Sequence, residues 1–444
     1  MPDPTPRRDP AALCAAAVQL RSQGQVTEAR RLYEQALLAE PGHFQANFDL
    51  AFMDLDAGQL DAAERRSAQG VARHGPSPAA AWLGARIALA RGDYAAVLAR
   101  LAPLLGATGL SPEQRAEALL LNADALDGLG RPGEAFASTA EGKALQRVIH
   151  ARRAASREGE VEKLRRLADW FAAADPAPWR SAPSPLAVPG EPETHVFLLG
   201  FPRSGTTLLE QVLAGSPEVT TLEEAPTLAD AYAQFMTGGD DLARLARLDA
   251  DEADAWRRGY WRTVAGLHPD PIGQVFIDKA PAGTLYLPLI AKLFPRARIL
   301  FALRDPRDVT LSCFRQNFQM NAMTYAFTDL AQTAACYDAC MRLAEVYRAV
   351  LPLDIHDVRH EALVEDFESH AADVAAYLGL AATPAMADLA ATTAGRTIRT
   401  PSGRQVRAGL NASGLGRWRA YAAELEPVRA ILALWVERFG YPAD

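Results

Sequence analysis

The chain is poor in the features that mark secreted or membrane proteins. Its four cysteines, Cys14, Cys313, Cys336 and Cys340, lack the paired spacing of a structural zinc site. We expect them to be buried free thiols in a reducing compartment. No apolar run reaches the roughly 18 residues that a membrane-spanning helix needs, and the first residues contain no signal-peptide pattern. These absences predict a cytoplasmic protein without a membrane segment.

An excess of positive charge is also missing. The formal net charge is −8 and the isoelectric point is about 5.6. This balance argues against a general binder of nucleic acids or of membrane surfaces. It leaves room for a local basic site that binds a small anion. The length of 444 residues predicts two or three domains.

The first third of the chain repeats with a period of about 34 residues. One glycine recurs in each unit, and two small side chains recur at fixed distances from it. The glycines are Gly24, Gly58, Gly92 and Gly130; the small residues are Ala17, Ala51, Ala85 and Ala123, then Ala29, Ala63, Val97 and Ala135. This pattern predicts two antiparallel helices per unit that cross closely, with the glycine ending the first helix.

The period and the small residues resemble the tetratricopeptide repeat, with about four repeats over residues 10–147. Tyr33, Ala36 and Pro41 complete the pattern in the first unit, whereas Ser67, Leu101 and Thr139 replace Tyr33 in the others. An irregular helical bundle is the alternative. The array either binds a protein or peptide or serves only as a platform for the rest of the chain.

A boundary follows the repeats. Residues 151–175 predict a helix that ends near Asp175, and the proline-rich stretch PAPWRSAPSPLAVPGEPET after it predicts an extended linker. We therefore assign residues 148–192 to a helix and linker and residues 193–444 to a second domain.

Residues 193–444 alternate between strand and helix patterns. Strands are expected at 195–199, 297–303 and near 355–358, and VFI before Lys279 is strand-like. Helices are expected at 207–214, at 282–293 and from Val309 onward. This alternation predicts an α/β domain with a parallel sheet and helices on both faces. Ligands of such sheets bind at the carboxyl ends of the strands, where Arg203 and Arg304 lie.

The loop Gly200–Thr207 is nearly a Walker A loop, but Thr206 stands where that loop has its lysine. Backbone amides before the following helix would hold a phosphate. Without the lysine, and without a clear strand ending in a magnesium-binding Asp, hydrolysis of nucleoside triphosphates is disfavoured. Arg304 and Ser312, eight residues apart, would hold a second phosphate. Two such sites suit a nucleotide phosphorylated at two positions.

Two stretches resemble a known family. FPRSGTTLLEQVLAGSPEV and ILFALRDPRDVTLSCFRQNF are similar to the 5′-phosphosulfate loop and the 3′-phosphate motif of sulfotransferases that use 3′-phosphoadenosine 5′-phosphosulfate (PAPS). The resemblance is to the tyrosylprotein sulfotransferase-like branch, and in particular to bacterial proteins with tetratricopeptide repeats before such a domain. It implies that the 5′-phosphosulfate is held by Arg203, Ser204, Gly205, Thr206 and Thr207, and the 3′-phosphate by Arg304 and Ser312.

The resemblance also implies catalytic roles. Glu224 matches the family's base, with Glu223 as the weaker alternative, and Lys279 and Arg203 would stabilise the leaving phosphate. Two further donor contacts are implied in the C-terminal strap, at Ser402 and Arg417; the second stands where the family has a lysine. His360 stands where a tyrosine often lies, so its contact is an open question.

The resemblance thus implies transfer of a sulfuryl group from PAPS to an acceptor hydroxyl, without a metal. A peptide tyrosine is one acceptor, but a sugar, a lipid or a small phenol fits the sequence equally well. Homologues of this kind make a homodimer plausible. The competing interpretations are a P-loop kinase or NTPase, disfavoured by Thr206, and a non-catalytic repeat scaffold.

Overall fold

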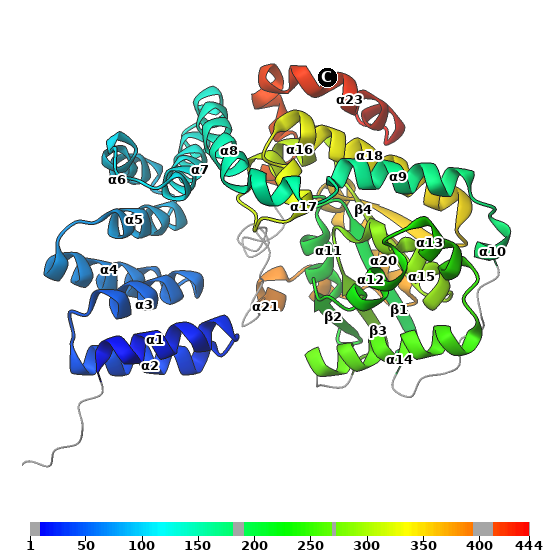
Figure 1. The fold of residues 1–444 in the computed structure, drawn as a ribbon, viewed down its shortest axis with the longest axis horizontal. Helices are drawn as coiled ribbons and strands as arrows, with labels where there is room; N and C mark the ends of the chain where they lie inside the picture. Colours follow the sequence, from blue (N-terminus) through cyan, green and yellow to red (C-terminus); the bar gives the residue numbers. More distant parts are fainter. Residues whose placement is uncertain (1–8, 181–190, 269–271, 394–411, 444) are drawn as a thin grey trace, which may run out of the picture. The chain divides into compact units, whose positions relative to one another are not determined.

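The chain divides into two compact units (Figure 1). The computed structural model describes residues 9–180, 191–268, 272–393 and 412–443. The first unit covers Met1–His150 and the second Ala151–Asp444.

The described part of the first unit consists of consecutive helix pairs: α1 (Pro10–Ser22) and α2 (Val26–Ala39), α3 (Phe44–Asp56) and α4 (Leu60–His74), α5 (Pro78–Ala90) and α6 (Tyr94–Gly106), α7 (Pro112–Gly128) and α8 (Pro132–Ala155). Each predicted glycine follows the first helix of a pair and has a positive φ between 71° and 80°. The N–H after it reaches five residues back, as from Gln25 to the Leu20 carbonyl at 2.9 Å. This is the hydrogen bond of a Schellman cap, so the predicted helix ends are confirmed.

Small side chains allow the helices of each pair to approach closely. Ala17, Ala29 and Tyr33 of the first pair are fully buried in one cluster. The equivalent small positions of the other pairs have at most 2% of their surface exposed: Ala51, Ala63, Ala85, Val97, Ala123 and Ala135. Gly130 follows Gly92 by more than the usual period mainly because α7 has 17 residues against 13 in α5, rather than because of a long loop. Helix α7 begins at a capping box formed by Ser111 and Gln114.

The single helix predicted over residues 151–175 is wrong in its bounds. The long helix α8 continues to Ala155, the chain turns at an extended Gly159, and α9 (Glu160–Ala173) and the short α10 (Ala177–Arg180) follow. Helix α9 packs along α18 (Leu330–Val350) of the second unit. Its apolar stripe, Leu164, Leu167 and Phe171, is fully buried there. Most of the predicted linker lies outside the described residues.

The second unit is built on a five-stranded parallel sheet in the order β2-β3-β1-β4-β5. Its strands are β1 (Thr194–Gly200), β2 (Val219–Glu223), β3 (Val275–Lys279), β4 (Arg298–Leu303) and β5 (Asp354–Arg359). The predicted parallel sheet is confirmed. Strand β2 was not among the predicted strands, because its threonines and half-buried pattern read as a polar loop. All five carboxyl ends meet at one edge, with β1 at the centre.

Helices cover both faces of the sheet. The helical segments between Thr206 and Leu293 are α11 (Thr206–Leu213), α12 (Ala229–Phe235), α13 (Gly239–Ala246), α14 (Ala250–Leu267), the 3₁₀ turn η1 (Gly283–Tyr286) and α15 (Leu287–Leu293). Those from Pro306 onward are α16 (Pro306–Arg315), α17 (Ala322–Ala326), α18, α19 (His360–Glu365), α20 (Phe367–Leu378), η2 (Pro384–Met386), α21 (Leu389–Thr393), η3 (Ala412–Gly414), η4 (Arg417–Tyr421) and α23 (Ala422–Arg438).

The central strand β1 is buried on both sides. Val196 and Leu198 belong to a core that includes side chains of α11 and α20. Phe197 points the other way, into an aromatic cluster with Tyr260 and Phe294. This alternation explains the continuous apolar run that predicted β1.

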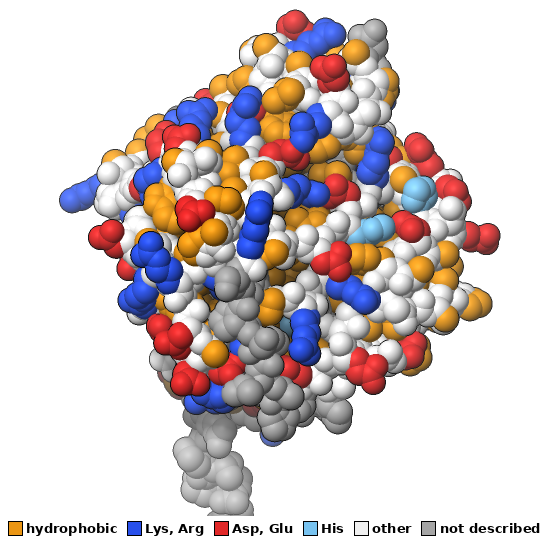
Figure 2. Space-filling model, turned by 90° about the vertical axis from the view of Figure 1, so that its right-hand side faces the viewer, with side chains coloured by type: hydrophobic (Ala, Val, Ile, Leu, Met, Phe, Trp, Pro, Cys, Tyr) orange, Lys and Arg blue, Asp and Glu red, His pale blue; other side chains and the backbone are white. Residues whose placement is uncertain are grey.

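The face drawn in Figure 2 carries acidic and basic side chains side by side rather than a field of one sign. Within the described ranges, no helix has the length and apolarity needed to cross a membrane.

Candidate active site

The loop after β1 is shaped for close approach of an anion. Arg203 has φ 71° and Gly205 has φ 96°, and α11 begins directly after that glycine. A Cβ on Gly205 would lie 2.5 Å from Nδ1 of His360, so only glycine fits under that ring. Free N–H groups at the start of an eight-residue helix favour a negative charge. The hydroxyl residues of the loop, Ser204, Thr206 and Thr207, are buried beneath it.

His360 begins α19 at the end of β5 and is partly buried beside the loop. Burial, together with the positive charges of Arg304 and Arg203, lowers the pKa of its imidazole to about 3. The ring is therefore neutral at pH 7. The sequence left the contact of His360 open; in the structure its ring packs against Gly205 of the anion loop.

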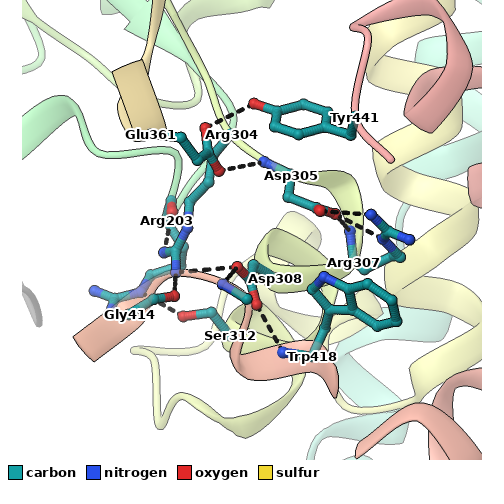
Figure 3. A network of polar contacts seen from close by, with 11 residues as sticks. Arg203, Arg304, Asp305, Arg307, Asp308, Ser312, Glu361, Gly414, Trp418 and Tyr441 are labelled. Carbon is teal, nitrogen blue, oxygen red and sulfur yellow. Dashed lines mark hydrogen bonds and ion pairs between the residues drawn. The ribbon is translucent and has the colours of Figure 1, made fainter. Parts of the chain in front are cut away.

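The two arginine motifs meet in one network, although they lie about a hundred residues apart (Figure 3). Nε of Arg203 donates to Oγ of Ser312 at 2.9 Å, and Arg304 donates to the carbonyl of Arg203 at 3.1 Å. Arg304 also donates to the carbonyl of Gly414, while its buried Nε has no hydrogen-bond partner in the described chain. Burial, and then the charge of Arg304, lower the pKa of Arg203 to about 10. Arg304 is buried and Arg203 half-buried, and the carboxylate of Asp308 lies 3.8 Å from Arg304; two neighbouring cations beside one carboxylate favour a further anion.

Asp308 fastens the C-terminal part of the chain to this network. Its carboxylate accepts the N–H groups of Gly416 and Trp418, each at 2.8 Å (Figure 3). Arg307 lies 3.7 Å from the centre of the Trp418 ring, a cation–π contact. Arg417, between the two bonded amides, is exposed. The fastened segment brings Arg417 to the same edge of the sheet as Arg304.

A buried lysine lies at the end of β3. Lys279 is fully buried, and its Nζ lies 2.9 Å from Glu224, 3.4 Å from Glu223 and 3.5 Å from Glu210. Burial alone would lower the pKa of Lys279, but the three carboxylates outweigh it and raise the pKa above its ordinary value. The lysine is therefore a stable ammonium at neutral pH.

The position of Glu224, which follows β2, is fixed by a backbone hydrogen bond to Lys279 at the end of β3. Its N–H donates to the carbonyl of Lys279 at 2.8 Å, which extends the β2–β3 ladder by one residue. Its φ is 48°, an uncommon backbone conformation for a non-glycine residue and one often found at functional sites. The side chain of Glu224 is 46% exposed, against 19% for Glu223. Of the two, Glu224 is the carboxylate that an acceptor can reach.

Comparisons with known proteins agree with this geometry. The family model described as sulfotransferase family matches residues 195–384, and a tetratricopeptide repeat model matches residues 20–87. The second unit is a sulfotransferase-family domain. The expectation of tetratricopeptide repeats before a sulfotransferase domain is thereby confirmed.

Relatives of the chain come from distant organisms. An uncharacterized protein of Aquifex aeolicus is 29% identical over 249 residues, covering 53% of this chain and 32% of that protein. Protein-tyrosine sulfotransferase 1 of Danio rerio is 26% identical over 155 residues, covering 34% of this chain and 42% of its own length. The chain thus spans less than half the length of each relative.

Solved structures include the sulfotransferase domain of the Synechococcus PCC 7002 olefin synthase. It is 21% identical, covers 58% of this chain and 99% of its own, and has a TM-score of 0.41. The sulfotransferase domain from the curacin biosynthetic pathway is 15% identical over 58% of this chain and 99% of its own, with a TM-score of 0.39.

The sulfotransferase domain gathers most of the residues singled out from the sequence at one edge of the sheet. Arg203, Arg304 and Ser312 form one network, and Lys279 and Glu224 form another. Ser402 lies outside the described residues. The ligand roles of all these residues stay predictions. Among the described residues, no group of three or more His, Cys, Asp or Glu is arranged to hold a metal ion. The four cysteines are buried and none of them forms a disulfide, as expected.

Sequence reasoning missed two residues of the site. Glu210 reads as an ordinary polar position of a helix, yet it is 1% exposed and faces Lys279. Asp308 reads as a favourable charge in the first turn of α16, yet it binds the C-terminal segment. Glu210 is the one charged residue of TTLLEQVL, and this was the available signal for it.

Proposed function

We propose that the sulfotransferase domain transfers a sulfuryl group from PAPS to an acceptor hydroxyl. The observation that carries this proposal is the contact of 2.9 Å between the buried Lys279 and the exposed Glu224. The pair lies at the carboxyl edge of the sheet, beside the anion loop that follows β1. A cation for a leaving phosphate and a carboxylate for a proton are the two groups that such a transfer needs.

The donor would use both anion-binding features. The loop Arg203–Thr207 would hold the 5′-phosphosulfate, since it turns at two residues of positive φ, Arg203 and Gly205, directly into the N-terminus of α11. Arg304 and Ser312 would hold the 3′-phosphate, and the unpartnered Nε of Arg304 supports an anionic ligand there. Ser402 and Arg417 are proposed as further donor contacts.

In the proposed reaction, the donor supplies a sulfuryl group bonded to a phosphate oxygen. Glu224 accepts the proton of the acceptor hydroxyl as the oxygen bonds to sulfur. The sulfur–oxygen bond to the 5′-phosphate breaks, and adenosine 3′,5′-bisphosphate leaves with the electron pair. Lys279 and Arg203 stabilise the negative charge that develops on this phosphate. The proposal needs no metal.

The acceptor is proposed to carry a hydroxyl, with a peptide tyrosine as one candidate. The repeat array is proposed to bind a protein or peptide, either the acceptor or a separate partner. The protein is proposed to act in the cytoplasm, without nucleic acid or membrane as partner, and a homodimer is its proposed assembly.

Calorimetric titration with adenosine 3′,5′-bisphosphate tests the donor class. We expect tight binding without magnesium, and loss of at least tenfold in affinity in Arg304→Ala, because a charge-assisted contact contributes about 1.5–3 kcal/mol. ADP should bind more weakly, since it lacks the 3′-phosphate. A preference for ADP with magnesium would instead favour a P-loop kinase or NTPase.

Transfer of labelled sulfate from PAPS to a panel of tyrosine peptides and phenols tests the base. Glu224→Gln should lower kcat by about 10²–10⁴-fold, the range of general-base catalysis, while bisphosphate affinity stays within a few-fold. Glu223→Gln is the matched control, because it makes the same change one residue away. A stronger loss in Glu223→Gln would move the base to Glu223.

A further inference from the structure

The three carboxylates around Lys279 cannot all have the same task. Glu224 has to leave the ammonium of Lys279 when it takes up the proton of the acceptor. At that moment Lys279 is drawn toward the leaving phosphate, and something else must keep its Nζ in place. Glu223 is the last residue of β2, and Glu224 follows it directly. Glu210 approaches from a different element, α11.

Glu210 is an unusual residue for its position. It has 1% of its surface exposed, and its Oε2 makes no hydrogen bond within the described chain, although Nζ of Lys279 lies 3.5 Å away. The other groups that face it are Glu223 and Thr221, both of β2. Three further segments pack on α11, namely β1, η2 and α21, and they contain no Asp, Glu, Lys or Arg. A carboxylate is costly to bury unless it is paired, and Lys279 is the cation that pairs with Glu210.

Burial is the largest influence on Glu210 and raises the pKa of its carboxyl to about 7; Lys279 opposes this rise and Glu223 adds to it. At neutral pH the group is therefore close to half protonated. Its charge then depends on how near the ammonium of Lys279 remains.

We infer that Glu210 is a positioning residue for Lys279, and this inference rests on the proposed function. Its carboxylate links the helix of the anion loop to the end of β3 and holds the ammonium from behind. The ammonium therefore stays beside the loop when Glu224 turns to the acceptor. A phosphate in the loop shares the ammonium with Glu210 without displacing it, which weakens the counter-charge of Glu210 and makes its carboxyl bind a proton more strongly.

Proton uptake on binding adenosine 3′,5′-bisphosphate tests this without knowledge of the acceptor. Calorimetry at pH 7 in two buffers of different ionisation enthalpy gives the number of protons taken up. Wild type should take up more protons than Glu210→Gln, by no more than about half a proton, because a carboxyl with a pKa of about 7 is already partly protonated at this pH. Glu218→Gln is the matched control, because Glu218 is exposed and forms none of the contacts with Lys279. The protons of the ligand's own phosphates cancel in these differences.

Equal uptake by wild type and Glu210→Gln would overturn the inference. Glu223→Gln gives a second test if Glu210→Gln does not fold. Because Glu223 raises the pKa of Glu210, this variant should change the proton uptake only in part, and complete loss of the uptake would also overturn the inference. On any acceptor that the wild type sulfates, Glu210→Gln should lower kcat by about tenfold or more while KM for PAPS stays within about twofold. Failure of the bisphosphate to bind wild type would reject the proposed function instead.

Discussion

Replacement of Gly205 by alanine is the most direct test of the anion loop. The residue has φ 96°, where a side chain is strained whatever space surrounds it. A Cβ there would also meet three atoms of His360: Nδ1 at 2.5 Å, Cγ at 2.9 Å and Cβ at 3.2 Å. Two of these atoms lie near the root of the side chain, so the ring has to move as a whole to avoid the new methyl group.

The expected cost is the sum of two effects. The left-handed backbone costs an alanine about 1–2 kcal/mol, and overpacking against the imidazole costs about 1–3 kcal/mol more. We therefore expect Gly205→Ala to lower the free energy of unfolding by about 2–5 kcal/mol. Gly379→Ala is the matched control, since its φ is 77° and a Cβ there would meet only Arg298, at 3.8 Å. Gly379→Ala should cost only the backbone contribution of about 1–2 kcal/mol.

Denaturant unfolding of the full chain measures these costs, with the transition of the sulfotransferase domain identified by its shift on binding adenosine 3′,5′-bisphosphate. In a double-mutant cycle, His360→Ala should relieve the steric part of Gly205→Ala, leaving a coupling of about 1–3 kcal/mol. The reasoning is refuted if Gly205→Ala costs no more than Gly379→Ala, or if the two substitutions at 205 and 360 are additive.

Three further variants test other parts of the chain. Asp308→Ala removes the acceptor of the Gly416 and Trp418 N–H groups, so limited proteolysis after residue 411 should accelerate; unchanged cleavage would contradict the role given to Asp308. Below pH 6.5 the unfolded state protonates His360 before the folded state does, so wild-type stability loses up to about 1.4 kcal/mol per pH unit through this residue. His360→Gln should remove that contribution. If the free energy of unfolding falls equally from pH 7 to 5 in wild type and in His360→Gln, the imidazole does not contribute to the pH dependence. Ala63→Leu overfills a fully buried helix crossing and should destabilise the repeat array by about 1–3 kcal/mol, without shifting the transition that responds to bisphosphate.

The repeat array was predictable because its signals are local. A glycine with positive φ ends a helix by its own backbone geometry, whatever surrounds it. The same holds for the strand, loop and helix around Gly200–Thr207, where an apolar run, a glycine-rich turn and an amphipathic run follow one another. These elements can be predicted because they depend only on residues that are neighbours in the sequence.

Strand β2 and the end of the helix after the repeats were not predictable in the same way. The residues of β2 pair with β3, which lies about fifty positions later in the chain, and without that partner the segment VTTLE reads as a polar loop. The stripe of α9 is explained only by the helix α18 that buries it. Strand pairing and helix burial each depend on a second segment that is distant in the sequence. The residues of one segment alone therefore do not predict them.

The sequence by itself determined the repeats, the parallel α/β domain and the residues that resemble a sulfotransferase site, because periodicity and short motifs act over a few residues. The tertiary structure alone decided which of those residues touch. It joined Arg203 to Ser312, buried Lys279 among three carboxylates, and turned Glu210 from a helix surface position into part of the site. These contacts depend on where parallel strands end, and the register of a sheet is set by packing across the whole domain.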